Sequence, residues 1–217
     1  MANNTELVFI LDKSGSMGGL EDDTIGGYNS FLKKQQERPE GTRITTVLFD
    51  DSYELLHDRL DLRAIKPITE KDYYVGGSTA LLDAIGKTIF KIEKVQKQSS
   101  KKYKPEKVLF VITTDGMENA SREYSYDSIK SLVEGKKKEG WEFIFLGANI
   151  DAICVAESIG ISNLRSANFH ADPRGIRNFF GSLACKVHDF RCSEGNLEDD
   201  WADEINKDFN EREKDKI

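Results

Sequence analysis

Residues 7–19 read Leu-Val-Phe-Ile-Leu-Asp-Lys-Ser-Gly-Ser-Met-Gly-Gly, an apolar run that breaks into polar and small residues. An apolar run of this length, bounded by a turn signal, predicts a buried strand at about residues 6–11. Asp12 then stands at the end of the strand, and Ser14 and Ser16 occupy alternate positions of the following turn. The glycines around them allow the backbone to bend tightly there.

The side chains of this turn favour one kind of chemistry. A carboxylate and two hydroxyls on alternate residues of a bent loop can converge on one point, and all three are hard oxygen donors. Hard oxygens suit Mg²⁺, Ca²⁺ or Mn²⁺ and are poor ligands for soft metals. A simpler interpretation is that Asp12 and a serine only cap the next helix. The metal hypothesis therefore depends on further oxygen ligands elsewhere in the chain.

Two later stretches supply such ligands. Gly76-Gly77-Ser78-Thr79 precedes a periodic apolar segment that predicts a helix at about residues 79–98, so Thr79 would stand at its N-terminus. Thr114-Asp115-Gly116 directly follows an apolar run that predicts a strand at residues 106–113. If the two strands are parallel neighbours, Asp115 and Asp12 meet at the sheet edge where open α/β sheets bind ligands.

Together these motifs resemble, in order and spacing, the von Willebrand factor type A domain with its metal-ion-dependent adhesion site. The resemblance covers roughly the first 165 to 190 residues. It implies a divalent metal at the carboxyl edge of the sheet. In the family pattern, hydroxyls bind the metal directly and the two carboxylates act mostly through water, which implies a ligand set of Asp12, Ser14, Ser16, Thr79 and Asp115.

The remaining pattern agrees with this fold. Wholly apolar strands alternate with amphipathic helices, which predicts a doubly wound, Rossmann-like α/β fold with a mostly parallel central sheet and helices on both faces. The short strand after Asp50-Asp51-Ser52 would pair back as one antiparallel edge strand. The other predicted strands are 44–49, 53–57, 141–146 and a marginal one at 163–168, and the other helices are 21–38, 126–138, one after Asp151 and one from Asp172-Pro173.

The end of the chain differs in charge from the rest. The formal net charge is −7, and from Glu194 onward ten acidic residues stand against four basic ones. We therefore assign residues 1–190 to the domain and residues 191–217 to an acidic extension, which disfavours nucleic acid as a partner. The plainer expectation for this extension is a solvated, partly disordered end. Helical spacing of its apolar residues also allows an amphipathic helix that folds back or binds a partner, through Leu197, Trp201, Ile205 and Phe209.

Location and redox state follow from what the sequence lacks. No apolar stretch is long enough to cross a bilayer, and Met1–Glu6 has no basic-then-apolar export pattern. We therefore expect a cytoplasmic protein, more similar to the intracellular bacterial and phage members of the family than to secreted adhesive ones. Three cysteines and no export signal indicate reduced thiols.

Three finer predictions concern packing. Cys154 and Cys185 fall on apolar helical patterns and are expected to fill small spaces in the core. Ile153 is expected to face inward from the helix after Asp151. Gly26-Gly27 weakens the first helix, and we expect it to allow close packing against the sheet.

The ligand types suggest a function. A metal held mainly by neutral hydroxyls keeps most of its charge and an open position, so it should bind an anionic oxygen from outside. The resulting hypothesis is a protein-binding module, not an enzyme, in which an Asp or Glu carboxylate of a partner protein completes the shell. Mg²⁺ is the first choice, with Mn²⁺ and Ca²⁺ as alternatives. The oligomeric state does not follow from the sequence.

Two other functions stay open. A Mg²⁺-dependent phosphoryl hydrolase would use a similar site, but Asp12-Lys13-Ser14 lacks the second aspartate of aspartate-nucleophile phosphatases, and no Gly-x-x-x-x-Gly-Lys-[Ser/Thr] loop is present. A metal-free scaffold domain is the third possibility.

Several residues near the motifs have two interpretations each. Asp50-Asp51 could border the site or simply form a turn. Glu118-Asn119 could contact a partner or start a helix, and Tyr73-Tyr74 could be exposed anchors or pack beneath the loop. Lys13 is expected to point away from the metal.

Overall fold

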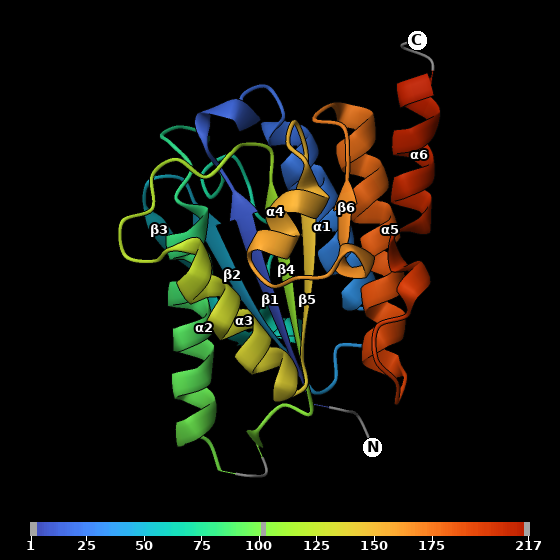
Figure 1. Ribbon diagram of the computed structural model, residues 1–217. Helices are drawn as coiled ribbons and strands as arrows, with labels where there is room; N and C mark the ends of the chain where they lie inside the picture. The colour runs from blue at the N-terminus through green and yellow to red at the C-terminus, as the bar shows by residue number, and fades with distance from the viewer. Residues whose placement is uncertain (1–3, 101–102, 215–217) are drawn as a thin grey trace.

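The computed structural model describes residues 4–100 and 103–214. Within these ranges the strands form one sheet of six, in the order β3-β2-β1-β4-β5-β6 (Figure 1). Neighbouring strands are parallel except for the antiparallel pair β2–β3. The predicted fold class is therefore confirmed. The strands are β1 (Thr5–Asp12), β2 (Thr42–Phe49), β3 (Tyr53–Asp61), β4 (Lys107–Thr114), β5 (Trp141–Gly147) and β6 (Ser166–Asn168).

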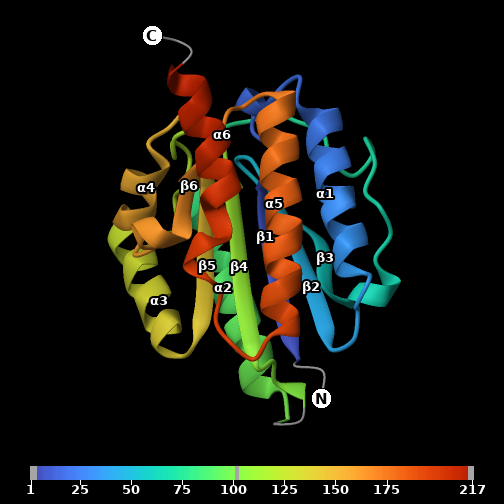
Figure 2. The same cartoon turned by 90° about the vertical axis from the view of Figure 1, so that its right-hand side faces the viewer.

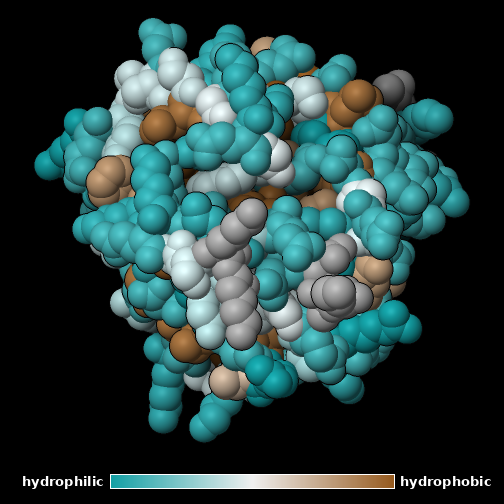
Figure 3. Space-filling view, turned by 90° about the horizontal axis from the view of Figure 1, so that it is seen from below, coloured by the Kyte–Doolittle hydropathy of each residue, from teal (hydrophilic) through white to brown (hydrophobic). Residues whose placement is uncertain are grey.

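Helices cover both faces of the sheet. One face carries α1, α5 and α6, which lie side by side in Figure 2, and the other carries α2, α3 and α4. Seen from below, the end of the molecule opposite the strands' carboxyl ends presents mainly hydrophilic side chains (Figure 3). The helices are α1 (Glu21–Gln35), α2 (Leu81–Gln98), α3 (Tyr126–Lys138), α4 (Ala152–Ser158), α5 (Pro173–Cys192) and α6 (Asp203–Lys214).

Strand β1 explains why the apolar run is unbroken. Because side chains alternate along a strand, Leu7 and Phe9 belong to the core under α1 and α5, whereas Val8 and Ile10 belong to the core under α2 and α3. Every residue of β1 is buried. The strand pairs in parallel with β4, with Leu11 opposite Thr113, so both strands end at the same edge of the sheet, at the top of Figure 1.

Several predicted boundaries are wrong, and one of them is the start of β2, at Thr42 instead of residue 44. Strand β3 continues to Asp61, where we expected irregular structure from residue 58. Its pairing with β2 shifts register at Thr46 and Arg59 has a φ of 48°, so a bulge breaks the alternation on which the prediction depended. Helix α1 ends at Gln35 instead of residue 38, α2 begins two residues after Thr79, and β6 has only three residues, Ser166–Asn168.

Helix α4 packs on the core as expected, but the inward orientation predicted for Ile153 is wrong. The buried residues of the helix are Ala152 and Ala156, whereas Ile153 is 42% exposed. Cys154 is also exposed, and so is Cys185 on α5, so neither cysteine fills a space in the core. A helix of two turns buries a narrow stripe, and the two alanines define that stripe.

The acidic extension folds back on the domain. Trp201 and Ile205 are almost fully buried, and the Trp201 indole donates a hydrogen bond of 2.7 Å to the Leu164 carbonyl. Helix α6 contacts both α5 and β6. The boundary at residue 190 stays a prediction, and Met1–Asn3 and residues 215–217 lie outside the described part of the chain. No helix in that described part is long and apolar enough to cross a membrane.

The glycine pair of α1 acts differently from our expectation. A Cβ on Gly27 would lie 2.3 Å from the Phe180 ring, so this glycine allows α1 to approach α5 and not the sheet. A Cβ on Gly26 would meet nothing within 4 Å. Gly27 and Phe180 are 153 positions apart in the sequence.

These two neighbouring glycines give a matched test. Gly27→Ala should destabilise the fold by about 1–3 kcal/mol, because the added methyl overlaps the Phe180 ring. Gly26→Ala should stabilise it by about 0.5–1 kcal/mol, because alanine is the better helix former and has room. Urea unfolding of both variants measures the difference. Equal effects would contradict the assigned α1–α5 contact.

Candidate functional site

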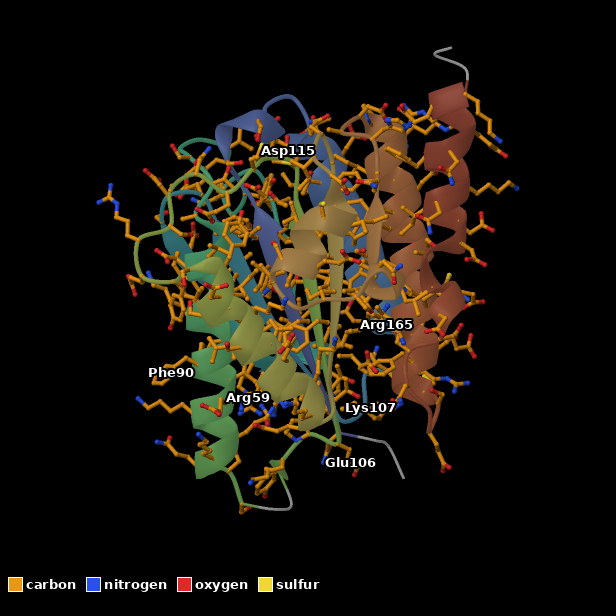
Figure 4. All side chains as sticks on the ribbon, in the orientation of Figure 1. Arg59, Phe90, Glu106, Lys107, Asp115 and Arg165 are labelled. Atoms are coloured by element: carbon orange, nitrogen blue, oxygen red, sulfur yellow. The ribbon has the colours of Figure 1, made fainter. Side chains whose placement is uncertain are left out.

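The five predicted ligand residues lie at the carboxyl edge of the parallel strands, where Figure 4 labels Asp115. Asp12 is the last residue of β1, and Asp115 directly follows the neighbouring strand β4. Ser14 lies in the turn after β1. These three residues are at most 2% exposed, and Thr79 is 3% exposed. Ser16 is exposed, so the cluster opens to solvent on its side.

Direct contacts connect most of the cluster. The hydroxyl oxygens of Ser14 and Ser16 are 3.2 Å apart, and the Ser16 hydroxyl donates a bond of 2.6 Å to Asp115 Oδ1. A Cβ on Gly116 would lie 3.2 Å from both Ser16 Oγ and Thr79 Oγ1, which places both hydroxyls next to that glycine. The structure therefore brings together side chains from three separate loops.

Asp12 is held more firmly than the other members. Its Oδ1 accepts a bond of 2.7 Å from the Ser14 backbone N–H, and its Oδ2 accepts one of 2.6 Å from the Thr114 hydroxyl. Both oxygens thus fix the turn and the end of β4. Sequence reasoning included Thr114 in its motif but gave it no role, although a hydroxyl beside a predicted ligand aspartate is a usable signal.

The electrostatics of the cluster fit a cation. Burial raises the pKa of Asp12 against the opposing effect of hydrogen bonds from Ser14 and Thr114. Burial likewise raises the pKa of Asp115, opposed by the bond from Ser16. Asp115 Oδ2 is buried and has no hydrogen-bond partner among the described residues. A buried, unpaired carboxylate oxygen is costly, and a bound cation would compensate it.

The donor set also limits which metal fits. Two carboxylates and three hydroxyls are the hard oxygens that Mg²⁺, Mn²⁺ and Ca²⁺ prefer. Within the described ranges, at this cluster as elsewhere, no group of three or more His, Cys, Asp or Glu residues could hold a metal ion, so the cluster depends on its hydroxyls. The residues present therefore fit a hydroxyl-rich divalent site.

Glu118 and Asn119 support the site from behind. Asn119 Oδ1 accepts a bond of 2.9 Å from the Thr79 N–H, and the Asn119 N–H donates one of 3.0 Å to the Thr79 carbonyl. Glu118 Oε2 accepts a bond from the Leu82 N–H at the start of α2. These residues hold the Thr79 loop in place and start no helix, since α3 begins at Tyr126. Contact of Glu118 or Asn119 with a partner stays a prediction.

The two tyrosines have separate roles. Tyr73 is buried, and its hydroxyl donates a bond of 2.6 Å to the Asp12 carbonyl beneath the loop. Tyr74 is 56% exposed, with Lys13 Nζ 4.2 Å from its ring centre. Lys13 itself is directed toward Asp50 and Glu54, at 3.4 Å and 3.2 Å. The lysine thus points away from the candidate ligands, as expected.

Gly77 is required by backbone conformation and by space. Its backbone φ is +69°, a value that residues with a side chain rarely adopt. A Cβ there would also lie 2.8 Å from Asp51 Oδ1 and 3.2 Å from Asp50 Cβ. The Gly77 carbonyl accepts a bond of 3.2 Å from the Gly15 N–H, so this glycine joins the Thr79 loop to the serine turn.

A known family model matches most of the chain. The family model of the von Willebrand factor type A domain matches residues 6–172. No curated protein matches the chain significantly by sequence. The match covers β1 to β6 and all five candidate ligands.

Solved structures share the fold at low identity. The PilB minor pilin from Streptococcus sanguinis is 14% identical, with a TM-score of 0.61 over 87% of this chain and 62% of the pilin. The vWF domain of the type V pili tip protein Mfa5 from Porphyromonas gingivalis is 12% identical, with a TM-score of 0.59 over 92% of this chain and 99% of that domain.

A third structure concerns the metal site. Proximal thread matrix protein 1 from the mussel byssus, with a zinc occupied MIDAS motif, is 16% identical, with a TM-score of 0.56 over 86% of this chain and 46% of that protein. This chain thus spans less than two thirds of both the pilin and the mussel protein. At such identities the likeness establishes the fold and leaves function to the site.

The support of Thr79 can be tested through stability. Asn119→Ala should destabilise the protein by about 1 kcal/mol, because the Thr79 N–H loses its acceptor. Ser78→Ala, at the exposed neighbouring position, should change stability by less than about 0.5 kcal/mol. Thermal or urea unfolding provides the measurement. An unchanged Asn119→Ala protein would mean that the hydrogen bond contributes nothing.

Proposed function

Because the chain belongs to the von Willebrand factor type A family, we propose that it is a metal-dependent protein-binding module. The observation that carries the proposal is the buried Asp115 Oδ2, which has no hydrogen-bond partner among the described residues and lies in one cluster with the hydroxyls of Ser14, Ser16 and Thr79. Such a cluster offers a cation mostly neutral hydroxyl oxygens, because both oxygens of the Asp12 carboxylate already accept hydrogen bonds.

The five candidate ligand residues have different roles in this proposal. Ser14, Ser16 and Thr79 supply neutral oxygens, and Asp115 supplies a carboxylate that already accepts a bond from Ser16. Asp12, with both oxygens engaged, positions the serine turn and Thr114. A bound divalent cation, for which Mg²⁺ is our first choice and Mn²⁺ or Ca²⁺ the alternatives, supplies positive charge for an outside anion. An Asp or Glu carboxylate of a partner protein is that anion.

Features of the structure and its neighbours support binding over catalysis. Lys13 is engaged by Asp50 and Glu54, and both Asp12 oxygens accept hydrogen bonds, which favours a structural role for both side chains. The mussel protein with a zinc occupied MIDAS motif favours a metal here, and the pilus proteins favour a protein partner. We further propose a cytoplasmic protein without nucleic acid or membrane partners.

Metal binding is the first test of this proposal. Calorimetric titration with Mg²⁺ and Mn²⁺, with and without acetate, should show binding that acetate strengthens. Thr79→Val keeps the side-chain shape and removes one oxygen, so it should weaken binding by about tenfold or more. Gly116→Ala should act in the same direction, because its methyl would lie 3.2 Å from both Ser16 Oγ and Thr79 Oγ1 and crowd them.

The control is Gly135→Ala on α3, where an added Cβ meets nothing within 4 Å. This variant should bind the metal like the wild type. Absence of binding by the wild type at millimolar metal and acetate would overturn the metal-dependent module in favour of the scaffold. Phosphatase activity lost in Asp12→Ala would instead favour the hydrolase.

A further inference from the structure

The surface above the buried ligands is made of small residues. Four exposed residues lie on the loops that carry the cluster, namely Gly15, Ser16, Gly77 and Ser78. Their side chains are too short to close the site. The exposed Ser16 hydroxyl is therefore the side from which a partner's side chain can approach the cluster.

Two large apolar side chains stand beside this opening. Tyr74 is 56% exposed and Met117 is 71% exposed. Met117 is two residues after Asp115, and Tyr74 lies on the loop whose Gly76 N–H donates to the Lys13 carbonyl at 2.9 Å. Phe90 on α2 is similarly exposed, at 60%, but lies far from Asp115 (Figure 4).

Sheet order places the two side chains on opposite sides of the serine turn. The turn follows β1, and Met117 follows β4, the neighbour of β1 on one side. Tyr74 lies over Lys13, which reaches Asp50 and Glu54 on the β2–β3 side. The loops that carry these two exposed apolar side chains therefore lie on opposite sides of the serine turn.

Tyr74 is suited to be a fixed anchor. The Lys13 ammonium contacts its ring and is itself held by Asp50 and Glu54. A ring held in this way loses little conformational freedom on binding, and buried aromatic anchors dominate many interfaces. Met117 has a flexible, polarisable side chain that adapts to the shape of a partner.

Charge at the opening restricts the partner further. Asp51 is exposed, and its Oδ1 would lie 2.8 Å from a Cβ at Gly77. A carboxylate next to the opening repels additional acidic residues of a partner. A single acidic residue with uncharged neighbours therefore fits better than an acidic run.

We propose that the partner presents one Asp or Glu flanked on both sides by apolar side chains, which pack against Tyr74 and Met117. The inference rests on the metal-dependent binding proposed above and specifies the partner of that same site. The acidic residue enters through the small residues and the apolar flanks cover the rim. Burial of the flanks also excludes water from the carboxylate–metal contact, which strengthens it.

Capped peptides with a single carboxylate test this inference. The probes are Ac-Leu-Gly-Asp-Gly-Leu-NH₂, the same peptide with glycines in place of the leucines, and the leucine peptide with Asn in place of Asp. NMR titrations in Mg²⁺ measure the affinities. The leucine–Asp peptide should bind the wild type about five- to thirtyfold tighter than the glycine–Asp peptide. The Asn peptide should bind far more weakly than either.

Variants assign the preference to the rim. Tyr74→Ser and Met117→Ser should each reduce the leucine preference by about threefold or more and leave the glycine–Asp affinity unchanged. Phe90→Ser, which removes a similarly exposed apolar side chain far from the site, should keep the full preference.

The outcomes separate the two proposals. Equal binding of the leucine–Asp and glycine–Asp peptides in Mg²⁺ would overturn the apolar rim and leave the metal-dependent module standing. A leucine preference that persists in both serine variants would also overturn the rim. If neither Asp peptide binds, whether Mg²⁺ or a chelator is present, both proposals are overturned together.

Discussion

The parallel pairing of β1 with β4 is the constraint on which the site depends. Both strands are apolar on both faces, so burial between two helical layers fixes their position in the sheet. Their register, with Leu11 opposite Thr113, brings the Asp12 turn beside the Asp115 loop. Two carboxylates are thereby held at one buried edge, an arrangement that isolated loops could not maintain.

The surrounding loops are organised to keep those carboxylates in place. Tyr73 bonds to the Asp12 carbonyl, Thr114 to the Asp12 carboxylate, and Asn119 to the backbone of Thr79. Gly77 joins the Thr79 loop to the serine turn through its carbonyl. Each supporting group is a few residues from a candidate ligand, so the motif and its support fold as one unit. Rigid support of this kind is what a precise binding site requires.

Sequence reasoning succeeded where the physics is local. Apolar runs predicted β1, β4 and β5, and Asp172-Pro173 predicted the start of α5, because burial periodicity and capping depend on near neighbours. The extension of β3 to Asp61 was not predicted, because the bulge at Arg59 breaks the alternation of inward and outward side chains in this edge strand. The contact between Gly27 and Phe180 escaped because it depends on packing between helices distant in sequence.

The candidate ligands were found together because their motif encodes chemistry as well as position, but the state of each oxygen was not predictable. The structure shows that both Asp12 oxygens and one Asp115 oxygen accept hydrogen bonds, and that the other Asp115 oxygen is buried without a partner in the described ranges. An unsatisfied buried carboxylate oxygen destabilises the cation-free form. A cation relieves it, yet the nearby hydroxyls carry no charge to neutralise that cation. Because the hydroxyls that would contact the cation are neutral, an open coordination position there favours an anionic oxygen from outside the chain, which is the physical reason for proposing a partner carboxylate.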